Sequence, residues 1–146
     1  MGSRIMFLLL AGLAGAAMAL QGSLNSVLGK VTGLMQATLV VHAVGAATTA
    51  LLLLLPFGEG SLAKLPQAPW YAYLGGVLGV LIIYSVVASI PRLGVAVATT
   101  AIIVGQVGLA MLIDHYGLFG LQKVPFTWLK LGGLVLLAVG ARLMLN

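Results

Sequence analysis

Long apolar runs with short polar breaks fill this 146-residue chain almost from end to end. A helix needs roughly 20 apolar residues to cross the hydrocarbon core of a bilayer. Four or five runs approach this length, and they leave no room for a soluble domain. The sequence therefore predicts an all-α integral membrane protein with five transmembrane helices in a single membrane domain, residues 1–146. The predicted helices cover about residues 5–28, 34–57, 70–90, 95–115 and 126–145.

The composition excludes a soluble globular domain of this size. Hydrophobic residues make up 62% of the chain and charged residues only 6%, with a mean hydropathy of +1.20. A net charge of +5 would suggest nucleic-acid binding in a soluble protein, but here the cations stand singly at the ends of apolar runs. Such cations anchor helices to lipid headgroups. We therefore expect contact with the lipid bilayer and no nucleic-acid partner.

The residues that enzymes and metal sites need are scarce. The chain has no cysteine, which excludes disulfides, thiol metal ligands and thiol nucleophiles. Its two acids, Glu59 and Asp114, lie near predicted membrane interfaces. No Ser/His/Asp set, carboxylate pair, phosphate-binding glycine loop or metal-ligand cluster occurs at a usable spacing. We expect no catalytic residue, no metal site and no cofactor, and an enzyme is disfavoured.

Glycines, prolines and aromatic residues mark the predicted ends of the first three helices. A short turn at Gly29–Gly33 joins the first two helices as an antiparallel hairpin. The longest polar connection, Gly58–Pro69, precedes an aromatic belt at Trp70–Tyr73. Arg4, the apolar run after it and Ala17–Ala19 also resemble a cleavable secretory signal. We interpret this segment as the first membrane helix, with cleavage as the alternative.

Proline and glycine also mark the ends of the last two predicted helices. Pro91 is expected to stop the third helix, and Arg92–Gly94 to lead into the fourth. Gly117 stands where a helix C-cap belongs. Pro125 is expected to open the fifth helix, with Trp128 at the interface.

The positive charges are almost balanced across the predicted membrane. Five crossings place the two termini on opposite sides, with four cations on the N-terminal side and three on the other. These are Arg4, Lys64, Lys123 and Lys130 against Lys30, Arg92 and Arg142. The positive-inside rule then predicts no strong preference for one orientation in the membrane. The sequence predicts dual topology and an antiparallel homodimer resembling a ten-helix inverted-repeat transporter, with an oppositely oriented paralogue as the alternative partner.

Polar residues interrupt the first helix where lipid would disfavour them. Gln21 and Asn25 are four residues apart and are expected to share one face. Gly15, Gly22 and Gly29 recur every seven residues and predict a groove for another backbone. We interpret this face as the lining of a substrate pathway. The alternative is interhelical hydrogen bonding without a substrate.

His42 is the one titratable side chain predicted well inside the apolar region. An intramembrane ionisable group is a functional-site candidate, and a neutral imidazole satisfied by its neighbours is the alternative. Counting helical rise places Gln21 and His42 at nearly the same depth, about 12 to 15 Å from one surface. Other polar residues are expected in the same half of the membrane: Asn25, Tyr84, Ser85, Thr99 and Thr100.

The fourth predicted helix carries three further candidates. Gln106 stands between Gly105 and Gly108 and could bond across helices or face the pathway. Asp114 and His115 end the helix, where an acid opposes the helix dipole and needs a nearby cation. Arg92 of an inverted second copy would lie on the same side as Asp114. The alternatives are a lysine of the same chain or simple solvation.

The candidate residues therefore form two sets. The expected substrate-binding residues are Gln21, Asn25, His42, Tyr84 and Gln106. The expected structural or intersubunit residues are Arg92, Asp114, His115, Gly15, Gly22 and Gly29.

Three stretches resemble a known family of membrane proteins. They are QGSLNSVLGKVTG at 21–33, WYAYLGGVLGVLIIY at 70–84 and GQVGLAMLIDHYGLFG at 105–120. Together they resemble the five-helix YdcZ-like branch of the drug/metabolite transporter superfamily. The resemblance implies a short bacterial inner-membrane protein that occurs as single units, pairs or ten-helix fusions.

A more distant similarity is to the small multidrug resistance proteins, which are dual-topology antiparallel dimers. Those proteins depend on a glutamate in the first helix, where this chain has Gln21 and Asn25 and no acid. A neutral, zwitterionic or anionic solute is then at least as reasonable as a cationic drug. The leading hypothesis is a secondary transporter of a small polar metabolite or drug-like solute. A passive dual-topology channel and a membrane scaffold without transport are the alternatives.

Overall fold

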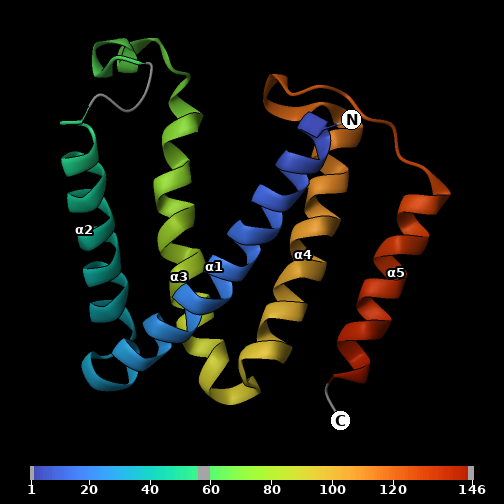
Figure 1. Cartoon of the computed structure of the whole chain (residues 1–146), viewed down its shortest axis with the longest axis horizontal. Helices are drawn as coiled ribbons and strands as arrows, with labels where there is room; N and C mark the ends of the chain where they lie inside the picture. Colours follow the sequence, from blue (N-terminus) through green and yellow to red (C-terminus); the bar gives the residue numbers. More distant parts are fainter. Residues whose placement is uncertain (1, 56–59, 145–146) are drawn as a thin grey trace. The chain divides into compact units, whose positions relative to one another are not determined.

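The computed structural model describes residues 2–55 and 60–144, and these residues are mainly helical. The chain divides into two compact units, residues 1–91 and 92–146, which are described one at a time. Figure 1 shows the helices, coloured by their order along the chain. The α-helices are α1 (Gly2–Thr32), α2 (Leu34–Leu52), α3 (Leu74–Leu93), α4 (Val95–Tyr116) and α5 (Trp128–Leu143). Three short 3₁₀ turns are η1 (Leu62–Gln67), η2 (Trp70–Tyr73) and η3 (Leu118–Gly120).

Large apolar side chains cover the outside of the described chain. Most leucines, and residues such as Leu129 at 89% and Val31 at 82%, are exposed. The few buried side chains are mostly small. Four helices in the described residues are long and apolar enough to cross a membrane, which fits lipid rather than water around this surface. They cover Arg4–Thr32, Leu34–Leu52, Trp70–Leu93 and Val95–Tyr116.

In the first unit, one glycine separates α1 from α2. Gly33 has φ +94°, a conformation that L side chains rarely adopt, and its N–H donates to the carbonyl of Gly29 at 3.0 Å. The predicted turn at Gly29–Gly33 was therefore wrong in length, because Gly29 to Thr32 are still helical. The end of α2 also differs, since α2 stops at Leu52 and turns follow. Its predicted end at Phe57 lies outside the described residues.

The connection into α3 is partly helical. Ser61 caps η1 by accepting a hydrogen bond from the Ala63 N–H at 3.2 Å. The Tyr73 hydroxyl donates to the carbonyl of Leu65 at 2.6 Å and ties η1 to η2. The predicted α-helix start at Trp70 was wrong, because Trp70–Tyr73 form a 3₁₀ turn before α3.

Pro91 lies inside α3 and does not stop it. Proline lacks an N–H, so the helix loses one backbone hydrogen bond there, but α3 continues to Leu93. The predicted stop at Pro91 and the predicted link Arg92–Gly94 were therefore wrong, and Gly94, with φ +81°, alone separates α3 from α4.

In the second unit, α4 ends as the sequence predicted. Gly117 adopts the left-handed conformation (φ 63°, ψ 41°) at the C-cap of α4. The chain then folds back, and the Val124 N–H donates to the carbonyl of Asp114 at 2.8 Å. The start of α5 differs from the prediction: Thr127 caps it by accepting from the Lys130 N–H, and Pro125 lies before the cap.

The fifth helix is short for a membrane crossing. Its 16 residues, Trp128–Leu143, span about 24 Å at 1.5 Å per residue, against a hydrocarbon core of roughly 30 Å. The predicted extension to Leu145 falls partly outside the described residues. A fifth crossing and the single membrane domain stay predictions.

Candidate functional site

Two glycines of α1 lie directly against side chains of α3. Gly22 lies so near α3 that a Cβ built on it would be 2.9 Å from Val86 Cγ1 and 3.1 Å from Ile90 Cδ1. A Cβ on Gly29 would collide with Val87 Cγ1. Val87 is 1% exposed and Ile90 is 8% exposed. Branched side chains of α3 therefore occupy the space that these two glycines leave on α1.

Gly15 does not belong to this contact. Among the described residues, no atom outside the adjoining helix backbone lies within 4 Å of the position that a Cβ on Gly15 would occupy. The predicted groove is therefore limited to Gly22 and Gly29 in the described chain. A role for Gly15 in packing against a second copy stays a prediction.

Asn25 lies on this same face of α1, between the two glycines. Its side chain is 6% exposed, and its Nδ2 is buried without a hydrogen-bond partner in the described residues. The neighbouring Ser26 is 3% exposed. A buried polar group without a partner costs about 1–3 kcal/mol. Asn25 is therefore a polar group whose partner is missing.

Gln21 is exposed, although it stands four residues before Asn25. Successive helical residues are about 100° apart, so Gln21 points well away from Gly22 and the α3 contact. The two amides predicted to share one face therefore differ in exposure: Gln21 is exposed and Asn25 is buried.

Several serine and threonine hydroxyls, including those of Ser85 and Thr100 from the predicted polar layer, are satisfied within their own helices. Each donates to the carbonyl four residues earlier, at 2.8 to 2.9 Å. This is the usual way in which an apolar helix accommodates serine and threonine. These residues are Ser23, Thr38, Ser85 and Thr100. They do not need a ligand to satisfy their donors, in contrast to Asn25.

His42 of α2 is half-buried and faces α3. Its Nδ1 is 2.8 Å from the carbonyl oxygen of Thr38. A carbonyl oxygen accepts only, so Nδ1 carries the proton and donates to it. Nε2 lies against α3, 3.2 Å from where a Cβ of Gly79 would be. In the neutral ring, Nε2 is then the hydrogen-bond acceptor.

Gln21 and His42 were predicted to lie at nearly the same depth, but the contacts beside them meet α3 at different levels. Gly22, next to Gln21, contacts Val86 and Ile90 of α3, whereas His42 lies at Gly79. These contacts are seven to eleven residues apart on α3, which is roughly 10 to 16 Å along its axis. Figure 1 shows the reason, because α1 runs obliquely across α3 rather than parallel to it.

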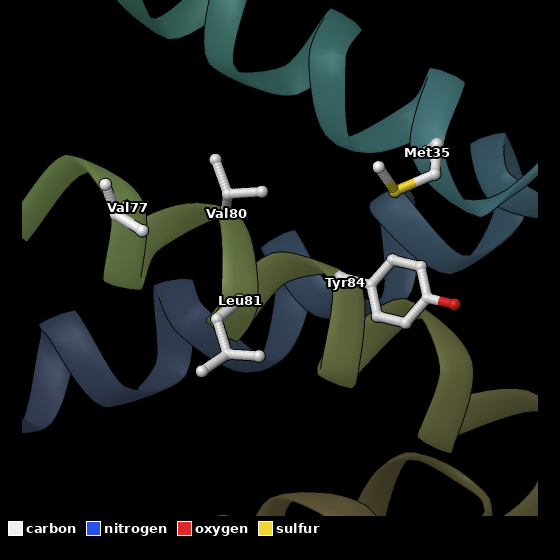
Figure 2. A pocket seen from close by; sticks show the side chains of 5 residues that line it. All are labelled: Met35, Val77, Val80, Leu81 and Tyr84. Carbon is white, nitrogen blue, oxygen red and sulfur yellow. The ribbon is translucent and has the colours of Figure 1, made fainter.

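Tyr84 lines an apolar groove between α2 and α3. Figure 2 shows the groove, of about 420 Å³, lined by Met35, Val77, Val80, Leu81 and Tyr84. The Tyr84 ring lies near Met35, and its hydroxyl is the one polar group among the side chains drawn. Tyr84 is 38% exposed. The groove offers apolar contact and little hydrogen bonding.

The candidates of the second unit lie at the two ends of its helices or on its surface. Gln106 is exposed. The N–H of Phe126 donates to His115 Nδ1 at 3.2 Å, and the His115 ring packs edge-on against Tyr116 and Phe126. His115 therefore anchors the connection between α4 and α5, as a structural residue.

The two charged candidates lie at helix ends. Asp114 is half-buried, and its backbone carbonyl accepts from Gly117 and Val124. Arg92 is exposed in the last turn of α3. An intersubunit pair between the two stays a prediction. No group of three or more His, Cys, Asp or Glu side chains that could hold a metal occurs among the described residues.

Three residues of the site were not predicted from the sequence. Ser26 is buried on α1, Val87 is buried against Gly29, and Gly79 gives His42 its space. The spacing of Gly22, Ser26 and Gly29 on one helical face is a signal for the first of these. Nothing in the spacing identifies Val87 as the facing residue.

Comparison with known proteins identifies a family. A family model described as "Putative inner membrane exporter, YdcZ" matches residues 6–143. The searches of curated proteins and of solved structures found no match. The chain belongs to this YdcZ family of inner-membrane proteins, which confirms the family resemblance and the membrane location.

Proposed function

We propose that this YdcZ-family chain is a secondary transporter that moves a small polar or drug-like solute out of the cell by alternating access. The family description supports export across the inner membrane. The observation that carries the proposal is Asn25, an amide 6% exposed in a highly apolar chain, with Nδ2 lacking a partner. Ionisable and polar groups inside membrane proteins commonly mark substrate pathways. The solute is the partner that Asn25 lacks.

The working unit of this proposal is a pair of inverted copies. The nearly balanced cations, four against three on the two predicted sides, support insertion in both orientations. Two inverted copies would reproduce the architecture of inverted-repeat transporters, in which substrate sites lie at the repeat interface near the membrane midplane. Each copy would contribute the Asn25 face of its α1.

The α1–α3 contact supplies the moving interface of the proposal. Val86, Val87 and Ile90 lie against Gly22 and Gly29, so no space for a solute remains beside the glycines. Access to Asn25 then requires α3 to move away from this face of α1. The movement breaks apolar contacts between the two helices.

Exchange measured in reconstituted vesicles tests the transporter directly. The probes are radiolabelled benzoate, benzamide and benzylammonium, each with counterflow from vesicles loaded with the same unlabelled solute. Saturable exchange of at least one probe is expected. A large unsaturable ionic current would instead favour a channel, and no flux above that of empty vesicles would favour a scaffold.

A further inference from the structure

The partner that Asn25 lacks has a chemistry that its surroundings define. Nδ2 is a donor and is buried without an acceptor in the described residues. The group that completes the site therefore presents an acceptor oxygen. Carbonyl and carboxylate oxygens are such acceptors, and an ammonium group is not.

The described residues around Asn25 supply no carboxylate to compensate a cation. The described part of residues 1–91 contains no aspartate or glutamate. Lys30 stands five residues after Asn25 on α1, roughly 7.5 Å along the helix axis. Lys30 is exposed and lies about 140° around the helix from Asn25, so it places no charge on the Asn25 face, and the described residues of this unit offer a cationic solute no carboxylate.

The apolar side of the site is equally defined. Val86, Val87 and Ile90 of α3 face the glycines that flank Asn25. A solute that separates α1 from α3 would contact these side chains while its acceptor oxygen meets Nδ2. An apolar body with one acceptor group fits both requirements.

We infer that Asn25 selects uncharged or anionic solutes that carry a carbonyl or carboxylate oxygen on an apolar body, and discriminates against organic cations. The inference rests on the proposed function, because it assigns the substrate class of the same site. It concerns the chemical class alone, so binding and flux can test it separately.

Three probes of matched shape test the class. Benzoate, benzamide and benzylammonium share one ring and differ in the group attached to it. In detergent, at about ten times their dissociation constants, benzoate and benzamide are expected to raise the melting temperature of the wild-type chain by roughly 3 °C. Benzylammonium is expected to leave the melting temperature unchanged.

Two substitutions of Asn25 link the effect to its amide. Asn25→Ala removes the donor, and stabilisation by both oxygen-bearing probes is expected to disappear. Asn25→Asp replaces the donor with an acidic acceptor, so stabilisation by benzoate should be lost and stabilisation by benzylammonium should be gained. Gln21→Ala is the matched control, because Gln21 is an exposed amide one turn away and the substitution should preserve the wild-type response.

Each result has a defined meaning for the inference. Stabilisation by benzylammonium alone, no stabilisation by any probe, or an unchanged response in Asn25→Ala overturns it. Saturable vesicle flux of benzylammonium alone would retain the transporter and overturn the substrate class. Binding of benzoate through Asn25 without flux would retain the substrate class and overturn the transporter.

Discussion

At the scale of single residues, the close approach of α1 and α3 depends on two glycines and a valine. Val87 is branched at Cβ, so its χ1 angle is restricted and its methyl groups cannot easily move aside. Gly29 provides the space that one of these methyl groups occupies. The fit is therefore sensitive to a single added methyl group.

Gly29→Ala is expected to destabilise the first unit by about 1–3 kcal/mol, because its Cβ collides with Val87 Cγ1. Thermal unfolding in detergent measures the change as a lowered melting temperature. Gly15→Ala is the control, because no described atom outside the adjoining helix backbone lies within 4 Å of its Cβ position. Alanine there should be neutral or stabilise by up to ~1 kcal/mol. Adding Val87→Ala to Gly29→Ala should restore part of the loss. Equal melting temperatures for Gly29→Ala and Gly15→Ala would contradict the packing described.

The sequence predicted the importance of this face of α1 but not its partners. The seven-residue spacing of glycines includes Gly22 and Gly29, which lie against side chains of α3, and also Gly15, whose Cβ position has no described atom outside the adjoining helix backbone within 4 Å. A spacing describes one helix, whereas a close contact depends on where a second helix crosses it. The exposure of Gln21 and the burial of Asn25 follow from that crossing, which no local pattern encodes.

At the scale of elements, helix type was easier to predict than helix ends. The apolar runs correctly located the five described α-helices because packing and lipid both favour helices there. The two shortest links were predicted too long, since single glycines at positions 33 and 94 suffice to end one helix and start the next. The end of α3 was predicted too early at Pro91, because proline removes only one hydrogen bond and a helix near its end can lose it.

Gly117→Ala tests the end of α4. Gly117 is left-handed, and a Cβ there would lie 3.2 Å from the Leu121 carbonyl oxygen, so alanine should cost about 1–2 kcal/mol. Chemical unfolding in detergent measures this loss. Gly105→Ala on the same helix is the control, because no described atom outside the adjoining helix backbone lies within 4 Å of its Cβ position, and it should cause no loss of stability. A similar loss for both variants would show that the left-handed cap is not the cause.

At the scale of the whole molecule, orientation in the membrane is the main prediction. The wild-type chain has no cysteine, so Thr32→Cys introduces a single exposed label site near the hairpin between α1 and α2. With dual topology, a membrane-impermeant maleimide should label about half of the copies from each side of the membrane. Labelling from one side alone would contradict dual topology in a homodimer.

Charge substitutions should shift this orientation in opposite directions. Arg92→Gln with Arg142→Gln leaves four cations against one on the two predicted sides and should fix the N-terminal side in the cytoplasm. Lys64→Gln with Lys123→Gln leaves two against three and should favour the reverse. The Thr32→Cys label measures both shifts. Unchanged labelling in both double variants would contradict the role of charge balance.

The central claim is that Asn25 contacts the transported solute, and counterflow of labelled benzoate into vesicles tests it most directly. Vesicles with the wild-type chain should show saturable uptake, and Asn25→Ala should reduce the initial rate about tenfold or more, as expected for a lost contact worth ~1.4 kcal/mol or more. Gln21→Ala should retain the wild-type rate. Wild-type uptake no greater than that of empty vesicles, or full uptake by Asn25→Ala, would contradict the claim.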